Sequence, residues 1–389
     1  MNKKSNEIEN RGQSDYLPAW AEVDLSRLEQ NAERIRSVLR EGTGLGAVLK
    51  ADAYGHGARE LAQALVKKHL VSMLIVGKKK EAEDLLTAVS GIPILILDKM
   101  TVSEVEYQKD WIYSVYELSF LQELSRKAQE HQTEYQVHIR IDLFGAGMGI
   151  PEKDMMTHMD EILHLPGVHV TGIYTHLYSG YQFVPEQIMS ELERFKCIIH
   201  RIPGEEREKL TVHAENSPMI FEFPDYQFDM VRSGTALFGL PFHPDKTYGT
   251  KPILNVKARV SGITKMKSDC MVSYRKCTEK SQRDTKMIVR FLLGYWDYPF
   301  LMTQKNIMVS INDVLYRVVD APCMDHSCIE VEEDSNIHLG DEITILGDKP
   351  GVTIYDILER HKINLVCSER LCMLSGRLPK IYKSSGEEK

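Results

Sequence analysis

The stretch Ala47-Val-Leu-Lys-Ala-Asp-Ala-Tyr-Gly-His-Gly57 joins a short apolar run to a lysine and to two glycines around a histidine. The apolar residues before Lys50 are typical of a buried strand, and segment 58–67 is typical of an amphipathic helix. Lys50 would then stand at the carboxyl end of a strand, which is the catalytic face of a parallel α/β barrel. A salt-bridged lysine is the commoner interpretation of such a residue, so the rest of the sequence is needed to choose between a structural and a catalytic lysine.

Strand-like and helix-like segments alternate around this stretch, from Ala19 to about Leu240. Units of about 25–30 residues over roughly 220 residues are typical of parallel α/β folds, and eight of them close a (β/α)8 barrel. The expected strands are 46–50, 72–76, 92–97, 112–115, 135–141, 168–174 and 210–213, and the expected helices are 25–39, 58–67, 79–86, 117–130 and 185–200.

The pattern changes near Lys251, where short apolar segments are separated by turn residues. The expected strands there are 253–260, 263–267, 286–293, 307–311, 314–319, 328–331 and 342–345, with helices at 354–361 and 368–374. The sequence therefore predicts an α/β protein with an N-terminal (β/α)8 barrel and a C-terminal mostly β domain. The expected boundaries are a disordered lead-in over 1–15, the barrel over 16–245 and the β domain over 250–385.

Charge and composition exclude several classes of function. The formal net charge is −8, which argues against nucleic-acid binding because that function needs a basic stripe. The apolar runs are too short to span a bilayer and the polar N-terminus lacks a signal-peptide core, so we expect a cytoplasmic protein. The seven cysteines include no Cys-x-x-Cys pair, and we predict neither a disulfide framework nor a metal site.

The whole stretch around Lys50 resembles the cofactor-binding signature of alanine racemases, which are fold type III pyridoxal-phosphate enzymes. Residues 21–25, Ala-Glu-Val-Asp-Leu, resemble the start of the same family, and the resemblance continues to about Tyr382. It implies that the cofactor is pyridoxal 5'-phosphate and that Lys50 forms a Schiff base with its aldehyde carbon.

A small hydroxyl, a glycine and neighbouring backbone amides at 216–217 and 232–235 suit a phosphate group. The resemblance assigns cofactor contacts to Tyr54, His176, Asn216, Ser217, Arg232, Gly234 and Thr235, and makes His213 a partner of the arginine. In the family the arginine faces the pyridine nitrogen. Because arginine keeps its proton, it would donate to that nitrogen and leave the ring a weaker electron sink.

Racemisation removes a proton from one face of Cα and returns one to the other face, which two bases do directly. Lys50 can serve one face. The resemblance gives the other face to Tyr274, in Val272-Ser-Tyr274, contributed by the partner subunit of a homodimer with shared active sites. A tyrosine with a pKa near 10 needs cationic or hydrogen-bond help to act as a base, and the resemblance assigns this help to His176 and Arg232. The resemblance also puts Tyr295 at the entrance and the backbone of Met324 on the substrate carboxylate.

Three positions depart from the family pattern on the substrate side. The family lysine that is often carbamylated becomes Arg140, the family arginine that orients the carboxylate becomes Gly147, and Arg275 replaces the glycine after the tyrosine base. A carbamate cannot form on arginine. Our hypothesis is that the guanidinium of Arg140 partly replaces the missing cation, because arginine pairs bidentately with carboxylates.

The fourth departure is Ser368, which replaces the family tyrosine above the substrate side chain. A small polar residue leaves room and a hydrogen-bond partner near Cβ, which favours L-serine beside L-alanine. In this feature the chain resembles the serine racemase domains of vancomycin-resistance clusters. That resemblance implies D-amino acids for peptidoglycan precursors and allows a separate membrane partner.

The main hypothesis is therefore a serine/alanine racemase, an isomerase. One alternative is an amino-acid decarboxylase of the same barrel class. Such enzymes have a different β-domain signature, often with a catalytic cysteine, and Cys323 lies near that region but in a racemase context. The other alternative is a catalytically weakened, cofactor-binding paralogue, which the changes at Arg140, Gly147 and Arg275 would explain.

The substitution Ser368→Tyr tests the substrate hypothesis. A pocket that only tolerates a hydroxyl discriminates by roughly 10²-fold or less, so we expect Ser368→Tyr to lower the serine-to-alanine ratio of kcat/KM within that range. The ratio is measured with both L-amino acids under identical conditions. An unchanged ratio would contradict the assignment of Ser368 to the substrate pocket.

Overall fold

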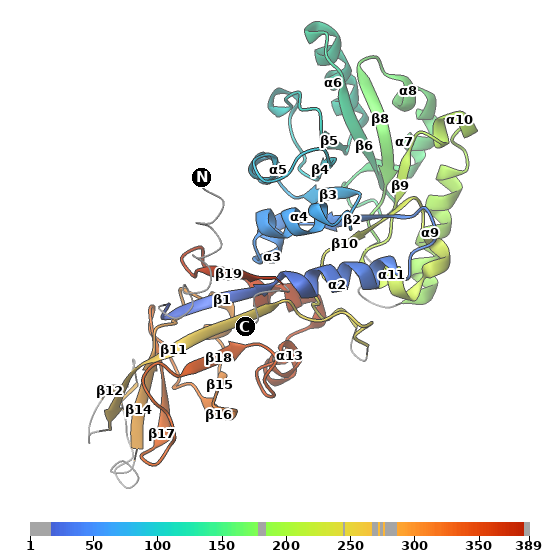
Figure 1. Ribbon diagram of the computed structural model, residues 1–389. Coiled ribbons are helices and arrows are strands. Elements are labelled where there is room, and N and C mark those ends of the chain that lie inside the picture. The colour runs from blue at the N-terminus through green and yellow to red at the C-terminus, as the bar shows by residue number, and fades with distance from the viewer. Residues whose placement is uncertain are drawn as a thin grey trace.

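The computed structural model describes residues 17–177, 184–243, 246–266, 271–272, 275–276 and 286–384, with the backbone alone for 271, 275–276 and 365–368. The expected lead-in over 1–15 lies outside these residues. The chain forms two units, a parallel barrel surrounded by helices and a sheet domain beside it (Figure 1). Within the described ranges, no helix has the length and apolar character needed to cross a membrane.

Eight parallel strands form the barrel in the order β10-β2-β3-β4-β5-β6-β8-β9. Hydrogen bonds from Asp229 N to Val212 O and from Arg232 N to Glu215 O, both 3.0 Å, link the two end strands, so the barrel is nearly closed. The predicted (β/α)8 architecture is confirmed. The strands are β2 (Gly44–Val48), β3 (Met73–Val76), β4 (Ile94–Ile96), β5 (Trp111–Val115), β6 (Tyr135–Asp142), β8 (Val168–Tyr174), β9 (Thr211–His213) and β10 (Met230–Ser233), and β7 (Ile150–Pro151) pairs with β6.

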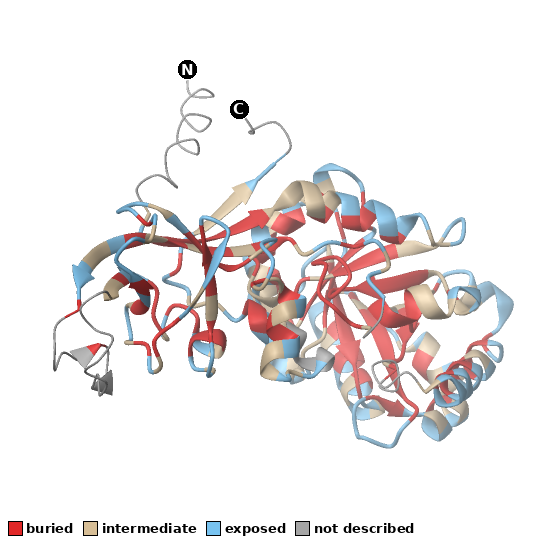
Figure 2. Ribbon diagram, turned by 90° about the horizontal axis from the view of Figure 1, so that it is seen from below, coloured by how far each residue is buried: buried red, intermediate tan, exposed pale blue. Residues whose placement is uncertain are grey.

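The longer helices around the strands bury an apolar face. In α2 (Leu25–Arg36), Leu28, Ala32 and Ile35 recur at helical spacing and are buried. Figure 2 shows the same division, with buried residues filling the strands and the inner sides of the helices. The other helices of this unit are α3 (Lys50–Tyr54), α4 (Ala58–Lys67), α5 (Lys79–Leu86), η1 (Val102–Glu104), α6 (Leu118–His131), α7 (Glu152–Thr157), α8 (Met159–His164), α9 (Pro185–Ile199), α10 (Gly204–Arg207), α11 (Ser217–Glu222) and η3 (Pro224–Tyr226).

The second unit is mostly β structure, as predicted. Its central strand β11 (Leu254–Lys265) is continuous, whereas the sequence suggests two strands. A register shift between Val260 and Gly262 lets β11 bend from one set of partners to another. The expected helix 368–374 is a 3₁₀ helix, η5 (Leu365–Cys372). The remaining elements are β12 (Met271–Val272), β13 (Arg275–Lys276), β14 (Lys286–Phe291), α12 (Pro299–Met302), β15 (Met308–Ile311), β16 (Val314–Arg317), β17 (Ser327–Glu332), β18 (Glu342–Leu346), α13 (Ile354–His361) and β19 (Lys380–Lys383).

The first strand, β1 (Ala19–Asp24), lies in the sheet of the second unit although it precedes the barrel in the sequence (Figure 1). It runs antiparallel to β11 and parallel to β19. The buried carboxylate of Glu22 pairs with Lys257 at 3.1 Å and with Lys383 at 2.9 Å, one lysine from each neighbouring strand. The segment 16–245 therefore includes a strand that belongs to the other sheet.

The second unit packs directly against the loop that follows β2. Gly55 has φ +87° and Gly57 has φ +99°, and a Cβ on either would overlap the Cys372 carbonyl oxygen or the Tyr382 hydroxyl. Lys380 Nζ also lies 2.8 Å from the Asp52 carboxylate. Only glycine permits this approach, because it has no side chain and adopts positive φ readily.

A pair of glycine substitutions separates this contact from backbone strain. Gly42 has φ +86° and open space around its Cβ position, so Gly42→Ala should cost only about 1–2 kcal/mol of backbone strain. Gly55→Ala adds the overlap with the second unit, and we expect a total loss of about 2–5 kcal/mol. Urea unfolding at one pH measures both. Equal losses would show that the contact at Gly55 is not tight.

Candidate active site

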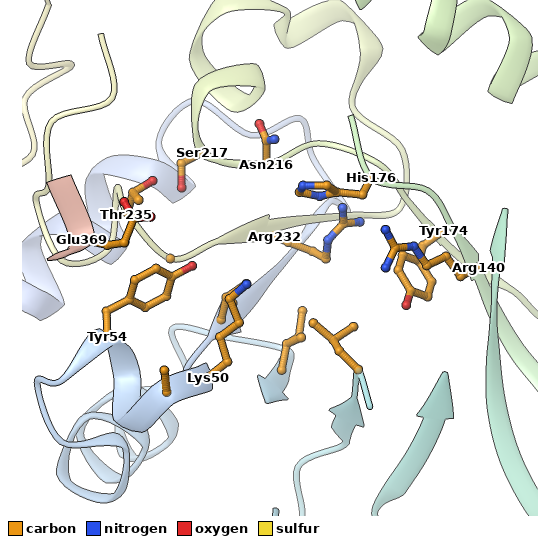
Figure 3. A pocket seen from close by; sticks show the side chains of 15 residues that line it. Lys50, Tyr54, Arg140, Tyr174, His176, Asn216, Ser217, Arg232, Thr235 and Glu369 are labelled. Atoms are coloured by element: carbon orange, nitrogen blue, oxygen red, sulfur yellow. The ribbon is translucent and has the colours of Figure 1, made fainter. Parts of the chain in front are cut away.

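A cavity of about 530 Å³ opens at the carboxyl ends of the barrel strands (Figure 3). Its wall combines residues from β2, α3, β6, β8, α11 and β10 with Glu369 from η5 of the second unit. The cavity brings together nine residues expected at the site, namely Lys50, Tyr54, Arg140, His176, Asn216, Ser217, Arg232, Gly234 and Thr235.

Four other expected residues are not in this wall. Tyr274 lies outside the described residues, as does the side chain of Ser368. Tyr295 lines a separate cavity in the second unit, and the side chain of Met324 is exposed. The two segments are neighbours, because Tyr295 N donates to Cys323 O at 3.1 Å.

The loop that carries Lys50 has an unusual backbone. Four consecutive non-glycine residues, Ala51 to Tyr54, have φ between 52° and 57°. Left-handed conformations cost L-residues roughly 1–2 kcal/mol each, so this turn needs external support. Ala58 N donates to Asp52 Oδ1 at 2.8 Å, and Ala51 N donates to Glu81 Oε1 at 2.5 Å. The turn directs the side chains of Lys50 and Tyr54 into the cavity (Figure 3).

One end of the cavity suits an anion. The hydroxyls of Ser217 and Ser233 form a hydrogen bond at 3.2 Å, and Ala236 N donates to Ser217 Oγ at 3.2 Å. In the described part of the chain, the buried hydroxyl of Thr235 has no hydrogen-bond partner. A Cβ on Gly234 would come within 3.0 Å of the Tyr54 hydroxyl, so glycine keeps this end open. The converging hydroxyls and amide therefore fit a phosphate group.

Arg232 is buried in the cavity wall, and within the described residues its guanidinium contacts three acceptors. Its Nη1 lies 2.7 Å from His213 Nδ1, and its Nη2 donates to Thr175 O at 2.8 Å and to Ala214 O at 3.0 Å. Because a guanidinium only donates, His213 Nδ1 must accept and its proton must be on Nε2. That proton is donated to His138 Nδ1, 2.9 Å away.

The histidines around Arg232 are neutral. Burial, together with the charge of Arg232, holds the pKa of His213 well below its usual value. Burial also lowers the pKa of His176 to about 3, with further effects from Arg232, Arg140 and Lys50. His176 therefore adds a hydrogen-bonding group to the site without adding a positive charge.

Tyr174 stands between two guanidinium groups. Its ring centre lies 5.4 Å from the Arg232 guanidinium carbon and 6.0 Å from that of Arg140. The ring stacks on His213 at 4.9 Å, and its hydroxyl donates to Ser114 at 2.9 Å. Burial raises the pKa of Tyr174, so its hydroxyl stays protonated. Two cations on one wall suit a bound carboxylate.

Comparison with known proteins identifies the family. The models described as alanine racemase, N-terminal domain, and alanine racemase, C-terminal domain, match residues 23–241 and 253–382. The chain belongs to the alanine racemase family. The expected family, the barrel with its β domain, and the racemase class of isomerases are thereby confirmed.

The chain is similar to alanine racemases along nearly its whole length. It is 31% identical over 390 residues to the alanine racemase of Clostridium perfringens strain SM101, and the match covers 95% of this chain and 96% of the relative. It is 29% identical over 373 residues to the alanine racemase of Methanococcus maripaludis, and that match covers 94% of this chain and 98% of the relative. The structure of alanine racemase from Clostridium difficile 630 matches with TM-score 0.85 and 27% identity, covering 95% and 96%. That of Bartonella henselae, with covalently bound pyridoxal phosphate, matches with TM-score 0.80 and 22% identity, covering 94% and 99%.

Sequence reasoning missed two polar residues of this cavity, Tyr174 and Glu369. Tyr174 is the last residue of β8 and is followed by Thr175 and His176, so its position at the strand end beside His176 could have pointed to it. Glu369 directly follows Ser368, and burial raises its pKa. Gly147, by contrast, lies in the loop after β6, where its amide donates to Asp142 at 2.8 Å and open space surrounds its Cβ position.

Proposed function

We propose that this protein is a pyridoxal-phosphate-dependent racemase that interconverts L- and D-alanine, and also L- and D-serine. The main support for this proposal is that one cavity is lined by Lys50, by the end around Ser217 and Thr235 that suits an anion, and by the guanidinium of Arg232. Pyridoxal phosphate, when bound, supplies a conjugated ring that takes up electron density as a Cα proton leaves.

The residues present fit this cofactor. Tyr54, Ser217, Gly234 and Thr235 would hold its phosphate, and the Lys50 amine would bond to its aldehyde carbon. Arg232 would donate to its ring nitrogen, since the acceptors at the end of β9 fix the guanidinium in the cavity wall. Asn216, whose Nδ2 donates to Leu177 O at 3.2 Å, keeps the segments after β8 and β9 together beside His176.

Each of the two proposed bases would serve one face of the substrate. Lys50 takes a proton from one face of Cα or returns it there, and Tyr274 does the same on the other face. Arg140 and the neighbouring wall would bind the substrate carboxylate and keep the amino acid in one orientation, because Arg140 is buried beside Tyr174. The neutral His176 can support the tyrosine through hydrogen bonding.

A homodimer with shared sites would complete this arrangement. Tyr295 and Met324 lie in the second unit and do not line the Lys50 cavity, so they would serve the cavity of a second copy. Two large apolar side chains are exposed next to each other in this region, Trp296 at 55% and Met324 at 45%, and Trp296 N donates to Met324 O at 3.1 Å. Exposed apolar side chains that gather in one region are typical of an interface.

The serine activity rests on Ser368, as argued from the sequence. In the cytoplasm, a serine/alanine racemase would supply D-amino acids for peptidoglycan precursors, as in vancomycin-resistance clusters. A separate membrane protein would then be its partner.

A chiral assay tests the proposed reaction. With L-alanine and L-serine, the purified protein and pyridoxal phosphate should form D-enantiomers, and Lys50→Ala should reduce turnover by at least about 10²-fold because one base and the cofactor bond are lost. Lys99→Ala is the matched control, since Lys99 is an exposed lysine paired with Glu117. An amine product would favour the decarboxylase, and cofactor binding without any product would favour the weakened paralogue.

The role of Arg140 has its own test. A hydrogen bond to a charged group contributes about 1.5–3 kcal/mol, so Arg140→Ala should raise KM for alanine by roughly 10- to 100-fold. Arg140→Lys keeps the charge but not the bidentate geometry, so its KM should lie between those of the wild type and Arg140→Ala. Arg194→Ala, which removes a surface pair with Glu152, serves as the control. Wild-type KM and turnover in Arg140→Ala would rule out the substrate contact.

A further inference from the structure

Glu215 is a buried acid without the partners that buried acids normally have. It follows β9 directly and its exposed fraction is 0%. Among the described residues, its Oε1 has no hydrogen-bond partner, and no side chain donates to its Oε2, which accepts a long bond of 3.4 Å from Ala214 N. A buried carboxylate is costly unless it is paired, so this group is favoured in its neutral form.

The buried acid Glu22 provides the contrast within the same chain. It is also nearly inaccessible, but Lys257, Lys383 and the indole N–H of Trp20 surround it. Burial opposes its ionisation, yet these partners outweigh burial and lower the pKa of Glu22. Glu22 is therefore a paired, ionised acid, and Glu215 differs from it in its partners rather than in its burial.

Glu215 belongs to the three-residue segment that holds Arg232. His213 Nδ1 and Ala214 O accept from the Arg232 side chain, and Glu215 O accepts from Arg232 N at 3.0 Å. The charged groups that act on the Glu215 carboxyl are Arg232 on β10 and Arg40 in the turn before β2. The remaining titratable group of the segment, His213, is neutral.

We propose that Glu215 is a positioning residue that acts through Arg232, and that loss of its proton weakens the hold of Arg232 on the cofactor ring. This inference rests on the proposed function, because the ring nitrogen is the partner that Arg232 would release. An ionised Glu215 adds a buried negative charge next to Ala214, whose carbonyl holds the guanidinium, and its attraction draws Arg232 toward the segment 213–215. A neutral Glu215 exerts no such attraction.

The change falls in the neutral pH range. Burial raises the pKa of Glu215 to about 7, and the backbone amides and Arg232 and Arg40 offset burial only in part. The unfolded chain has a glutamate pKa near 4.3, so the folded protein binds an extra proton between about pH 4.3 and 7. The stabilisation by this proton is complete below pH 4.3 and is lost as the pH rises through 7.

Two measurements on three proteins test the proposal. The proteins are the wild type, Glu215→Gln, which is permanently neutral, and Glu22→Gln as the control at the paired acid. The first measurement is the urea midpoint of the cofactor-free protein from pH 5 to pH 9. We expect the wild type to lose stability relative to Glu215→Gln across pH 7, while Glu22→Gln keeps the wild-type step near pH 7.

The second measurement is the dissociation constant for pyridoxal phosphate at pH 6 and at pH 8.5. We expect wild-type affinity to weaken by about tenfold more than that of Glu215→Gln between these values, since one pKa unit corresponds to tenfold. Comparing the ratio between proteins cancels the titration of the cofactor itself. Glu215→Leu, which also cannot ionise, gives a second reading if Glu215→Gln folds poorly.

The outcomes separate this inference from the proposed function. A stability step without a difference in cofactor affinity would make Glu215 a merely structural acid and overturn the positioning role. Identical pH profiles for the wild type and both Glu215 variants would overturn the inference while the cofactor still bound. Failure of the wild type to bind pyridoxal phosphate at either pH would overturn the proposed function itself, and with it any role of Glu215 toward the cofactor.

Discussion

The buried guanidinium of Arg232 is the constraint on which the rest of the site depends. A permanent charge in the barrel mouth has to be surrounded by acceptors, and the end of β9 and the residue after β8 supply them. Burial, helped by the same charge, keeps His213 and His176 neutral, and the hydrogen bond from Arg232 determines which nitrogen of His213 carries the proton. The direction of the hydrogen bond between His213 and His138 follows from this one group.

The second constraint is the left-handed turn after Lys50. Four strained residues in succession are tolerated only because contacts from elsewhere hold them, including Asp52 with Lys380 of the second unit. Gly55 and Gly57 let that unit approach closely enough to make these contacts. The second unit thus has a direct part in the site, because it supports the turn that carries the lysine and adds Glu369 to the cavity.

The departures from the family pattern are unevenly distributed. The residues that we expect to hold a phosphate and a ring nitrogen line one cavity, whereas the changes that the family resemblance implies at Arg140, Gly147 and Ser368 would concern the substrate side. Arg140 stands in the wall beside Tyr174, while Gly147 is in an open loop. The cavity wall therefore retains a second cation at Arg140, although the family arginine at position 147 is absent.

The sequence by itself determined the barrel, the mostly β unit and the set of residues around Lys50, because apolar periodicity and local motifs report strands, helices and strand ends. Only the tertiary structure decided that β1 joins the other sheet, since periodicity does not reveal which strand edge a segment pairs with. It also decided that Tyr174 lies between two guanidinium groups and that Glu215 is an unpaired acid while Glu22 is a paired one. Both glutamates look alike in the sequence and both are buried in the structure, and what differs is the set of partners brought near them from distant segments.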